Sequence, residues 1–289
     1  MKLPLNQLYV PDHIDGFILR TALRDSRFSA RRFGATQHEP AALHHRDELE
    51  LNLTVRGRAH YLIGDRKFQV RANDMLWILP RQNRLFFDAS DNYLAWVLAF
   101  RRRLVRRVCT TAFSQPLRQL GGQVPLLRRL SRPAVIALEE IYQGVPTGLN
   151  RDVFNSGLAY ALTRSWLAFQ DASTVAVPDR VHPAVREAAW RMRDAPPLMD
   201  NAALGRVCGL SATRLSRLFR QQMGIPLAEF RNRCRLQHFL RIYGDGADIN
   251  MTSAALDAGF GSYAQFHRVF RQLMGQTPRD YARPARTES

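Results

Sequence analysis

The chain has 289 residues, enough for two domains of ordinary size that each bury a core. Its net charge of +17 and pI of about 11.0 predict a polyanionic partner, with nucleic acid as the first candidate and RNA or a membrane surface as alternatives. Three scattered cysteines exclude a disulfide framework and a cysteine-rich zinc site. The longest apolar run, residues 94–100, is far shorter than the roughly 20 residues that span a bilayer, and the N-terminus lacks a signal peptide, so a cytoplasmic protein is expected.

Strand-like segments fill the stretch from about residue 28 to residue 100. Residues 48–55 alternate strictly, with leucine or valine on one face and Glu48, Glu50, Asn52 and Thr54 on the other. One face should therefore be buried, and the other should meet water or a cavity. Further short segments follow at even spacing: 59–63, 68–70, 75–79, 85–87 and 94–100. Short strands with regular turns predict an antiparallel barrel or sandwich.

From residue 101 to residue 170, the apolar residues no longer alternate with polar ones but recur at the spacing of a helix. Residues 101–132 hold nine arginines and no acidic residue, which we interpret as a solvated basic helix face, with contact to DNA phosphates or an acidic partner as the alternative. Residues 134–142 and 151–169 read as amphipathic helices. An apolar stripe on the second predicts either packing against the barrel or a subunit interface; its members are Phe154, Leu158, Leu162, Trp166 and Phe169.

The C-terminal part contains an internal repeat. Residues 217–224 read RLFRQQMG and residues 268–275 read RVFRQLMG, so that six of eight letters agree. Gly209-Leu210 matches Gly259-Phe260, with one extra residue in the second copy's turn. Each copy reads as a short helix, a glycine turn and a second helix that ends at a glycine, which is the outline of a helix-turn-helix. A lead helix to residue 193 precedes the copies, and residues 227–243 connect them.

The second helix of each copy is the predicted DNA-reading element, because that helix enters the major groove in a helix-turn-helix. Ser211 and Ser262 are the expected N-caps. The apolar positions should face the domain: Leu215, Leu218, Phe219, Phe266, Val269 and Phe270, with Met223 and Met274 also expected in the core. The outward positions near the helix starts are Thr213, Arg214, Ser216, Arg217, Tyr263, Ala264, His267 and Arg268.

Two arginines are the strongest base-reading candidates. Arg217 and Arg268 could each bond bidentately to guanine, with a phosphate contact as the alternative. Arg220 and Arg271 lie one turn further along, where phosphate contact is favoured, and Arg214 is also assigned to phosphate. A connecting helix of about 17 residues is roughly 25 Å long, so one monomer could read two successive major grooves.

The second repeat carries a dense set of matching positions: Ala255, Ala258-Gly259-Phe260, Ser262-Tyr263, Phe266, Arg268, Phe270, Gly275, Thr277-Pro278 and Tyr281. On these residues, the stretch from about 182 to 283 resembles the C-terminal DNA-binding domain of the AraC/XylS family of bacterial transcription regulators. The resemblance implies base reading by Thr213, Ser216, Arg217, Tyr263, Ala264, His267 and Arg268. It also implies a homodimer, contact with RNA polymerase and a place at the bacterial nucleoid, and it leaves activator or repressor open.

The N-terminal half is similar to the cupin-like sensor domain of many family members. His44, Glu50 and Gly57 stand as His-x5-Glu-x6-Gly. Arg46 occupies the position of a second metal-binding histidine, so we expect no metal, no cofactor and no enzyme activity, with His45 as a substitute ligand in the alternative. Arginine in a barrel could instead bind a carboxylate or phosphate effector. The pocket candidates are His44, Arg46 and Glu50, with Trp77 and Trp96 as walls; local salt bridges are the alternative.

The expected fold is α+β. Residues 1–170 should form a cupin-like antiparallel β-barrel followed by helices, residues 171–181 a linker, and residues 182–289 an all-α domain with two helix-turn-helix motifs. We expect a sequence-specific, double-stranded-DNA-binding transcription regulator whose N-terminal half senses a small-molecule effector, forms a dimer, or both. The alternative is a cupin-type metal-dependent enzyme with a helical appendage.

Overall fold

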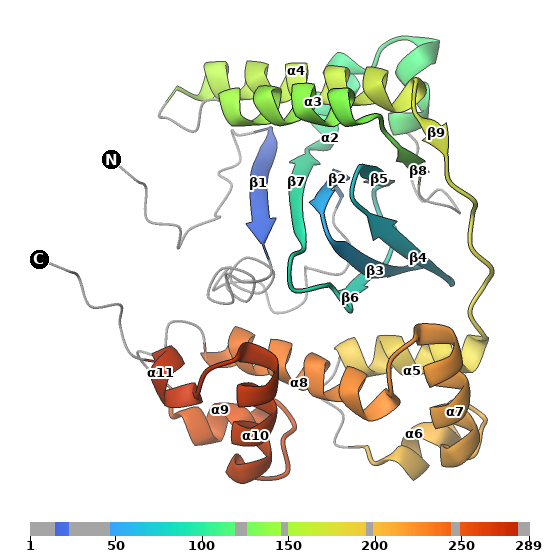
Figure 1. Cartoon of the computed structure of the whole chain (residues 1–289), viewed down its shortest axis with the longest axis vertical. Coiled ribbons are helices and arrows are strands. Elements are labelled where there is room, and N and C mark those ends of the chain that lie inside the picture. The colour runs from blue at the N-terminus through green and yellow to red at the C-terminus, as the bar shows by residue number, and fades with distance from the viewer. Residues whose placement is uncertain are drawn as a thin grey trace, which may run out of the picture. The chain divides into compact units, whose positions relative to one another are not determined.

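A computed structural model describes residues 15–22, 47–118, 126–145, 150–194, 199–243 and 249–282. Backbone contacts divide these residues into two compact units, with the change from one to the other between Asp179 and Arg180 (Figure 1). In the described ranges, no helix is both long enough and apolar enough to cross a membrane. The mixed α+β class is confirmed, while the expected domain limits remain a prediction.

The first unit is built on antiparallel strands in two sheets. The six-stranded sheet has the order β1-β7-β2-β5-β8-β9, and the three-stranded sheet has the order β4-β3-β6. The strands are β1 Gly16–Ala22, β2 Leu49–Arg56, β3 Arg58–Ile63, β4 Arg66–Arg71, β5 Asp74–Ile78, β6 Arg84–Phe87, β7 Leu94–Phe100, β8 Leu126–Arg129 and β9 Ser173–Thr174. All five short segments expected after β2 are confirmed as strands, whereas β1, β8 and β9 were not predicted, and β9 lies in the stretch expected to be a linker. The part of the expected strand region between residues 28 and 46 lies outside the described residues.

Both faces of β2 are buried. The leucines of this strand join a core with the helices of the first unit. The alternate positions face the other way, and Glu50, Asn52 and Thr54 are only 5%, 2% and 1% exposed. The polar face therefore lies inside the strand layers rather than in water, because residues next to one another in a strand point to opposite faces.

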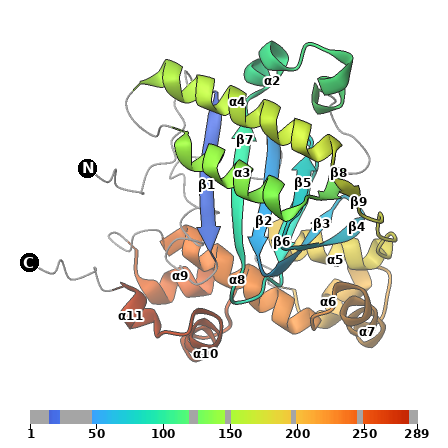
Figure 2. The ribbon, with the colours of Figure 1, turned by 45° about the horizontal axis from the view of Figure 1, so that its top comes forward.

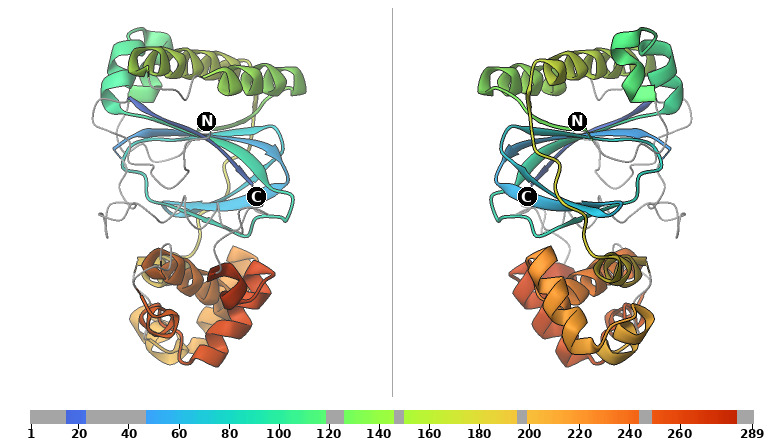
Figure 3. Two further views of the ribbon diagram at one scale, coloured as in Figure 1. Left: turned by 90° about the vertical axis from the view of Figure 1, so that its left-hand side faces the viewer. Right: turned by 90° about the vertical axis from the view of Figure 1, so that its right-hand side faces the viewer.

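Helices cover the outer face of the six-stranded sheet. They are α2 Arg102–Val108, the 3-10 helix η2 Ala112–Arg118, α3 Arg132–Gly144 and α4 Arg151–Gln170. Figure 2 shows α3 and α4 lying across the strands, and Figure 3 shows them on one side of two curved strand layers. Of the apolar stripe on α4, Leu158, Leu162, Trp166 and Phe169 are buried in this core and Phe154 is half-buried against it. The stripe thus serves internal packing, the first of its two interpretations.

The second unit consists of helices. They are α5 Pro183–Asp194, α6 Asn201–Val207, α7 Ala212–Met223, α8 Leu227–Tyr243, α9 Met251–Asp257, α10 Tyr263–Met274 and α11 Pro278–Ala282. The connecting helix α8 packs against both repeats. Near its start the Phe230 ring lies 5.1 Å from Phe219 of α7, and near its end the Phe239 ring lies 4.4 Å from Phe266 of α10.

Candidate nucleic-acid interface

Serine caps set where the two expected DNA-reading helices, α7 and α10, begin. The Oγ atoms of Ser211 and Ser262 accept backbone N–H bonds from Arg214 at 3.3 Å and from Gln265 at 3.2 Å. These bonds satisfy donors that the first turn of a helix leaves unpaired. The predicted N-caps are confirmed.

Glycines set where the same helices end. Gly224 and Gly275 have left-handed φ values of 84° and 68°. Their N–H groups donate to the carbonyls of Arg220 and Arg271 at 2.9 Å and 3.0 Å. A left-handed residue closes a helix at little cost only when it has no Cβ, so both predicted C-terminal glycines are confirmed.

The buried residues of α7 and α10 show which side of each helix packs against the domain, so the opposite side faces outward. In α7, Leu215, Phe219 and Met223 are buried, and in α10 the buried residues are Phe266, Val269 and Phe270. Leu218 and Met274, which we expected in the core, are only half-buried. Both lie at the edge of the apolar stripe, where the helix surface turns toward solvent.

The predicted DNA-contacting residues lie on the outward face. Tyr263 is 39% exposed, and its hydroxyl donates weakly to Met251 Sδ of α9 at 3.8 Å. Ser216 and His267 are half-buried, at matching places in the two copies. The remaining candidates are exposed: Thr213, Arg214, Arg217, Arg220, Ala264, Arg268 and Arg271.

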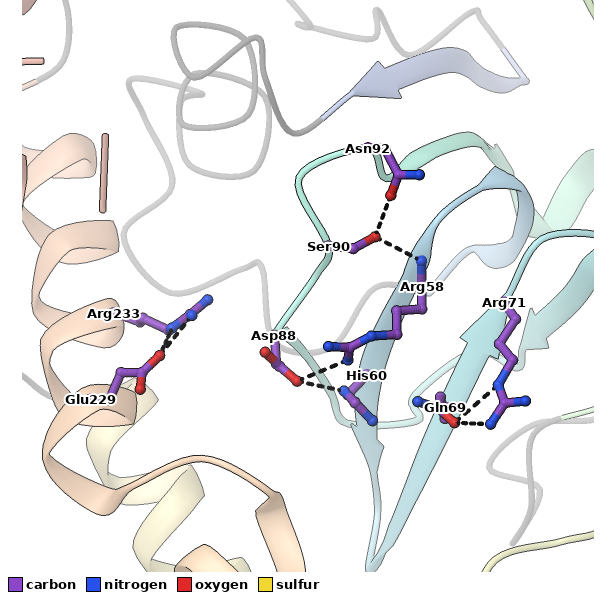
Figure 4. Close-up of polar contacts among 9 residues, drawn as sticks. All are labelled: Arg58, His60, Gln69, Arg71, Asp88, Ser90, Asn92, Glu229 and Arg233. Carbon is purple, nitrogen blue, oxygen red and sulfur yellow. Dashed lines mark hydrogen bonds and ion pairs between the residues drawn. The ribbon is translucent and has the colours of Figure 1, made fainter. Parts of the chain in front are cut away.

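The electrostatics of this face suit an anionic partner. In the described part of the chain, no carboxylate lies within ion-pair distance of any of the five arginines on the two helices. By contrast, Arg233 of α8 is held by Glu229 at 2.7 Å (Figure 4). The unneutralised guanidinium groups on α7 and α10 can therefore bond to phosphate or base oxygens.

Inside the strand layers, Glu50 belongs to a polar network. Its carboxylate pairs with Arg84 and accepts a bond from Asn52 Nδ2 at 3.0 Å. The Asn52 Oδ1 atom accepts from the Tyr61 hydroxyl at 3.1 Å. Burial raises the pKa of Tyr61 well above its usual value and that of Tyr93 to about 12, so both phenols stay protonated. Glu50 therefore makes local salt-bridge and hydrogen-bond contacts, which was the alternative to its role as a pocket residue.

Trp77 and Trp96 do not share a pocket with Glu50, which corrects the expectation that they form its walls. Trp77 is fully buried against the Trp166 ring at 5.9 Å, and Trp96 Nε1 donates to Glu139 Oε1 at 3.1 Å. Both rings project toward the helices, on the face opposite to Glu50. The sequence pattern could not assign the faces because both are buried. The other two pocket candidates, His44 and Arg46, lie outside the described residues, and so does His45.

The described residues contain no group of three histidine, cysteine, aspartate or glutamate side chains placed to hold a metal ion. Sequence reasoning did not single out Arg58, Arg71 and Arg129, which line a cavity of about 630 Å³ in the first unit. These three come from different strands, so no local spacing could have brought them together.

Comparison with known proteins identifies both parts of the chain. A family model for a helix-turn-helix domain matches residues 204–284, and a model for an AraC-like ligand binding domain matches residues 27–162. The chain is 33% identical over 99 residues to the HTH-type transcriptional regulator GlxA of Rhizobium meliloti, across 34% of this chain and 30% of that protein. The chain thus spans less than a third of that relative's length. It is 27% identical over 241 residues to the arabinose operon regulatory protein of Salmonella typhimurium, across 80% and 82% of the two chains.

Among solved structures, ToxT of Vibrio cholerae aligns with 92% of this chain and 97% of its own, at 11% identity and a TM-score of 0.36.

Proposed function

Because the chain belongs to the AraC family of transcription regulators, we propose that it binds specific sites in double-stranded DNA through its two helix-turn-helix units. The observation that carries this proposal is the pair of capped helices, α7 and α10, whose outward faces hold arginines without a carboxylate partner in the described residues. Such a face can enter a major groove and meet both bases and phosphates.

Within this proposal the arginines divide into two roles. Arg217 and Arg268 lie in the first half of each helix and read guanine through the two parallel bonds that a guanidinium can donate. Arg214, Arg220 and Arg271 contact phosphates. The remaining base-reading positions are Thr213, Ser216, Tyr263, Ala264 and His267, where Ala264 offers only an apolar contact, for instance to a thymine methyl.

The connecting helix supports reading of two grooves by one chain. α8 has 17 residues, which corresponds to about 26 Å at the rise of an α-helix. Together with the width of the helices at its ends, this length approaches the roughly 34 Å that separates successive major grooves on one side of DNA.

Control by a small molecule is part of the proposal, since the first unit matches an AraC-like ligand binding domain. In the described residues, the interior candidate Glu50 is already engaged by Arg84 and Asn52. A ligand that reached Glu50 would have to replace these contacts, so binding there would rearrange the strand layer.

Dimer formation also belongs to the proposal. The buried stripe of α4 is not available, but the opposite face exposes Val153, Tyr160 and Leu167, which are 46%, 57% and 42% exposed. They stand seven residues apart, the interval at which one helix face meets a second helix. A second copy of this chain paired along α4 would cover them. Contact with RNA polymerase and a place at the bacterial nucleoid in the cytoplasm complete the proposed role.

Substitution of Arg217 or Arg268 by alanine tests the base-reading assignment. Each change should cost about 1 to 3 kcal/mol at the selected site and relax base preference at one position. Lysine is the informative second variant, because it keeps the charge and loses the planar fork. Affinity is measured on the preferred duplex and on scrambled duplexes. Equal loss on every sequence, restored by lysine, would make these residues phosphate contacts.

The competing function is excluded by the family to which the chain belongs. Its relatives are transcription regulators rather than enzymes, so a metal-dependent cupin enzyme is no longer an alternative.

A further inference from the structure

An open surface cavity of about 630 Å³ lies at one end of the strand layers of the first unit. Its lining includes Arg58 and Arg71, at the paired ends of β3 and β4, and Arg129 of β8. Polar groups from the loops complete it, namely Asn73, Ser90 and Asn92. Its volume falls within the range of about 300 to 1,000 Å³ that small-molecule sites occupy, although this pocket is shallow and open to solvent.

The arginines of this cavity are not neutralised equally. Arg129 Nε donates to the fully buried Asp74 at 2.7 Å, and Arg58 Nη1 lies 3.4 Å from Asp88. Arg71 instead donates its Nε and Nη2 protons to Gln69 Oε1, at 3.1 Å and 2.7 Å (Figure 4). Because an amide oxygen carries no formal charge, the positive charge of Arg71 has no balancing carboxylate among the described residues.

The loops around the arginines are held in place before any ligand arrives. Ser90 Oγ accepts the backbone N–H of Arg58 at 3.0 Å and donates to Asn92 Oδ1 at 2.8 Å (Figure 4). Asn73 has a positive φ of 71°, and its backbone is fixed by bonds to Thr54 and Leu130 at 2.8 Å and 2.9 Å. Its buried Oδ1 atom accepts no hydrogen bond from the described residues. A buried acceptor of this kind needs a donor.

We propose that this cavity binds an anionic small molecule, whose phosphate or carboxylate group is held by Arg71 between Arg58 and Arg129. A guanidinium binds such oxyanions through two parallel bonds. Among the described residues, the three arginines pair with two carboxylates, Asp74 and Asp88, which leaves one positive charge for the ligand. The exposed Asp91 lies between two lining residues in the chain but does not line the cavity.

This site is separate from the interior network of Glu50 and Arg84, and it gives the proposed regulator a second place to sense a metabolite. The regulatory meaning rests on the proposed function, but binding itself does not. The test therefore measures anion binding and DNA binding separately on the same full-length proteins.

The experiment titrates inorganic phosphate and citrate into the full-length protein by calorimetry at constant ionic strength, with chloride as the reference anion. We expect saturable binding of at least one of the two anions. Arg71→Gln should weaken it at least tenfold, because it removes the unbalanced charge. Arg102→Gln is the matched control: it removes an exposed arginine of α2 that does not line the cavity, and it should leave the affinity unchanged. Arg58→Gln, a second lining variant, should weaken the same binding.

Weaker anion binding in Arg71→Gln and Arg58→Gln, but not in Arg102→Gln, supports the site. Binding of phosphate or of citrate then assigns the ligand to the phosphate or to the carboxylate class. Absence of saturable binding, or equal affinity in wild type, Arg71→Gln and Arg102→Gln, would overturn the inference. Competition by duplex DNA through the cavity arginines would also overturn it, since the cavity would then belong to a DNA surface. A mobility shift with each protein shows whether DNA binding persists, so that failure of this site and failure of the proposed function can be distinguished.

Discussion

The two helix-turn-helix copies reach the same architecture by different local packing. α6 and α9 each have seven residues, and α7 and α10 each have twelve. In the first copy the turn passes so close to α6 that a Cβ on Gly205 would lie 2.6 Å from the Leu210 carbonyl oxygen. The equivalent residue of the second copy is Ala255, which is fully buried, and there the turn is longer by Gly261. The extra residue leaves room for a methyl group.

The outward faces differ more than the packing does. Arg217 and Arg268 are equivalent, so they cannot distinguish the DNA segment under α7 from the segment under α10. The first copy adds small hydroxyl side chains at Thr213 and Ser216, where the second has Ala264 and His267. The residues that the copies share hold both in the same fold, while the differing residues must supply any difference in preferred DNA sequence.

Truncation of a buried phenylalanine in α7 or α10 should change stability most, and it tests whether the two copies depend on each other for stability. Phe219 and Phe270 are fully buried, and both ring systems meet α8. Replacing either by alanine should cost about 3 to 5 kcal/mol. If α8 couples the copies, urea unfolding followed by circular dichroism will show the whole second unit losing stability in one transition with either variant. A separate transition for the unmutated copy would show that the copies are independent.

A smaller effect is expected from exchanging the small residues behind the turns. Gly205→Ala should destabilise the first copy by about 1 to 3 kcal/mol, because the new methyl group would crowd backbone atoms that cannot move independently. Ala255→Gly is the matched reverse change and should cost about 1 kcal/mol through the lower helix propensity of glycine. Both are measured by urea unfolding. A more stable Gly205→Ala protein would show that helix propensity outweighs crowding in the first turn.

Substitutions that make the outward face of α10 resemble that of α7 should have the smallest effect on stability and the most specific effect on the choice of DNA sequence. Ala264→Thr combined with His267→Ser gives α10 the outward residues of α7 at two positions. Exposed and half-exposed substitutions of this kind should change stability by less than about 0.5 kcal/mol. Selection from random-sequence DNA should then yield two segments with more similar preferences. Unchanged selection would show that these positions do not read bases.

The helix-turn-helix unit was predictable in detail because its signals are local. The twelve-residue helix α10 directly follows the cap Ser262 and directly precedes the closing Gly275, and both end residues act through a backbone bond to a near neighbour. The strand β8 was not predictable, since Leu126–Arg129 lies in an arginine-rich stretch and gains its strand form by pairing with β5. β1 similarly depends on β7, which is far away in the chain.

The first unit shows a second limit of sequence patterns. Alternation correctly separated the two faces of β2, but it could not say which face meets the helices, because both are buried. The expectation that Trp77 and Trp96 form pocket walls with Glu50 used no strand register, and the register puts them on the opposite face. The cavity with Arg58, Arg71 and Arg129 depends on three separate strand ends and leaves no mark in local spacing.

Because α8 is one continuous helix, its length also sets the rotation of α10 relative to α7 about the α8 axis. Each residue added to or removed from its middle would turn the second copy by about 100° about the helix axis and shift it by about 1.5 Å. One such change would point α10 away from the groove that α7 faces. Three or four together would restore the direction and lengthen the reach by about 5 Å, one helical turn. The distance between the two DNA segments that this architecture can read is therefore adjustable only in steps of whole helical turns.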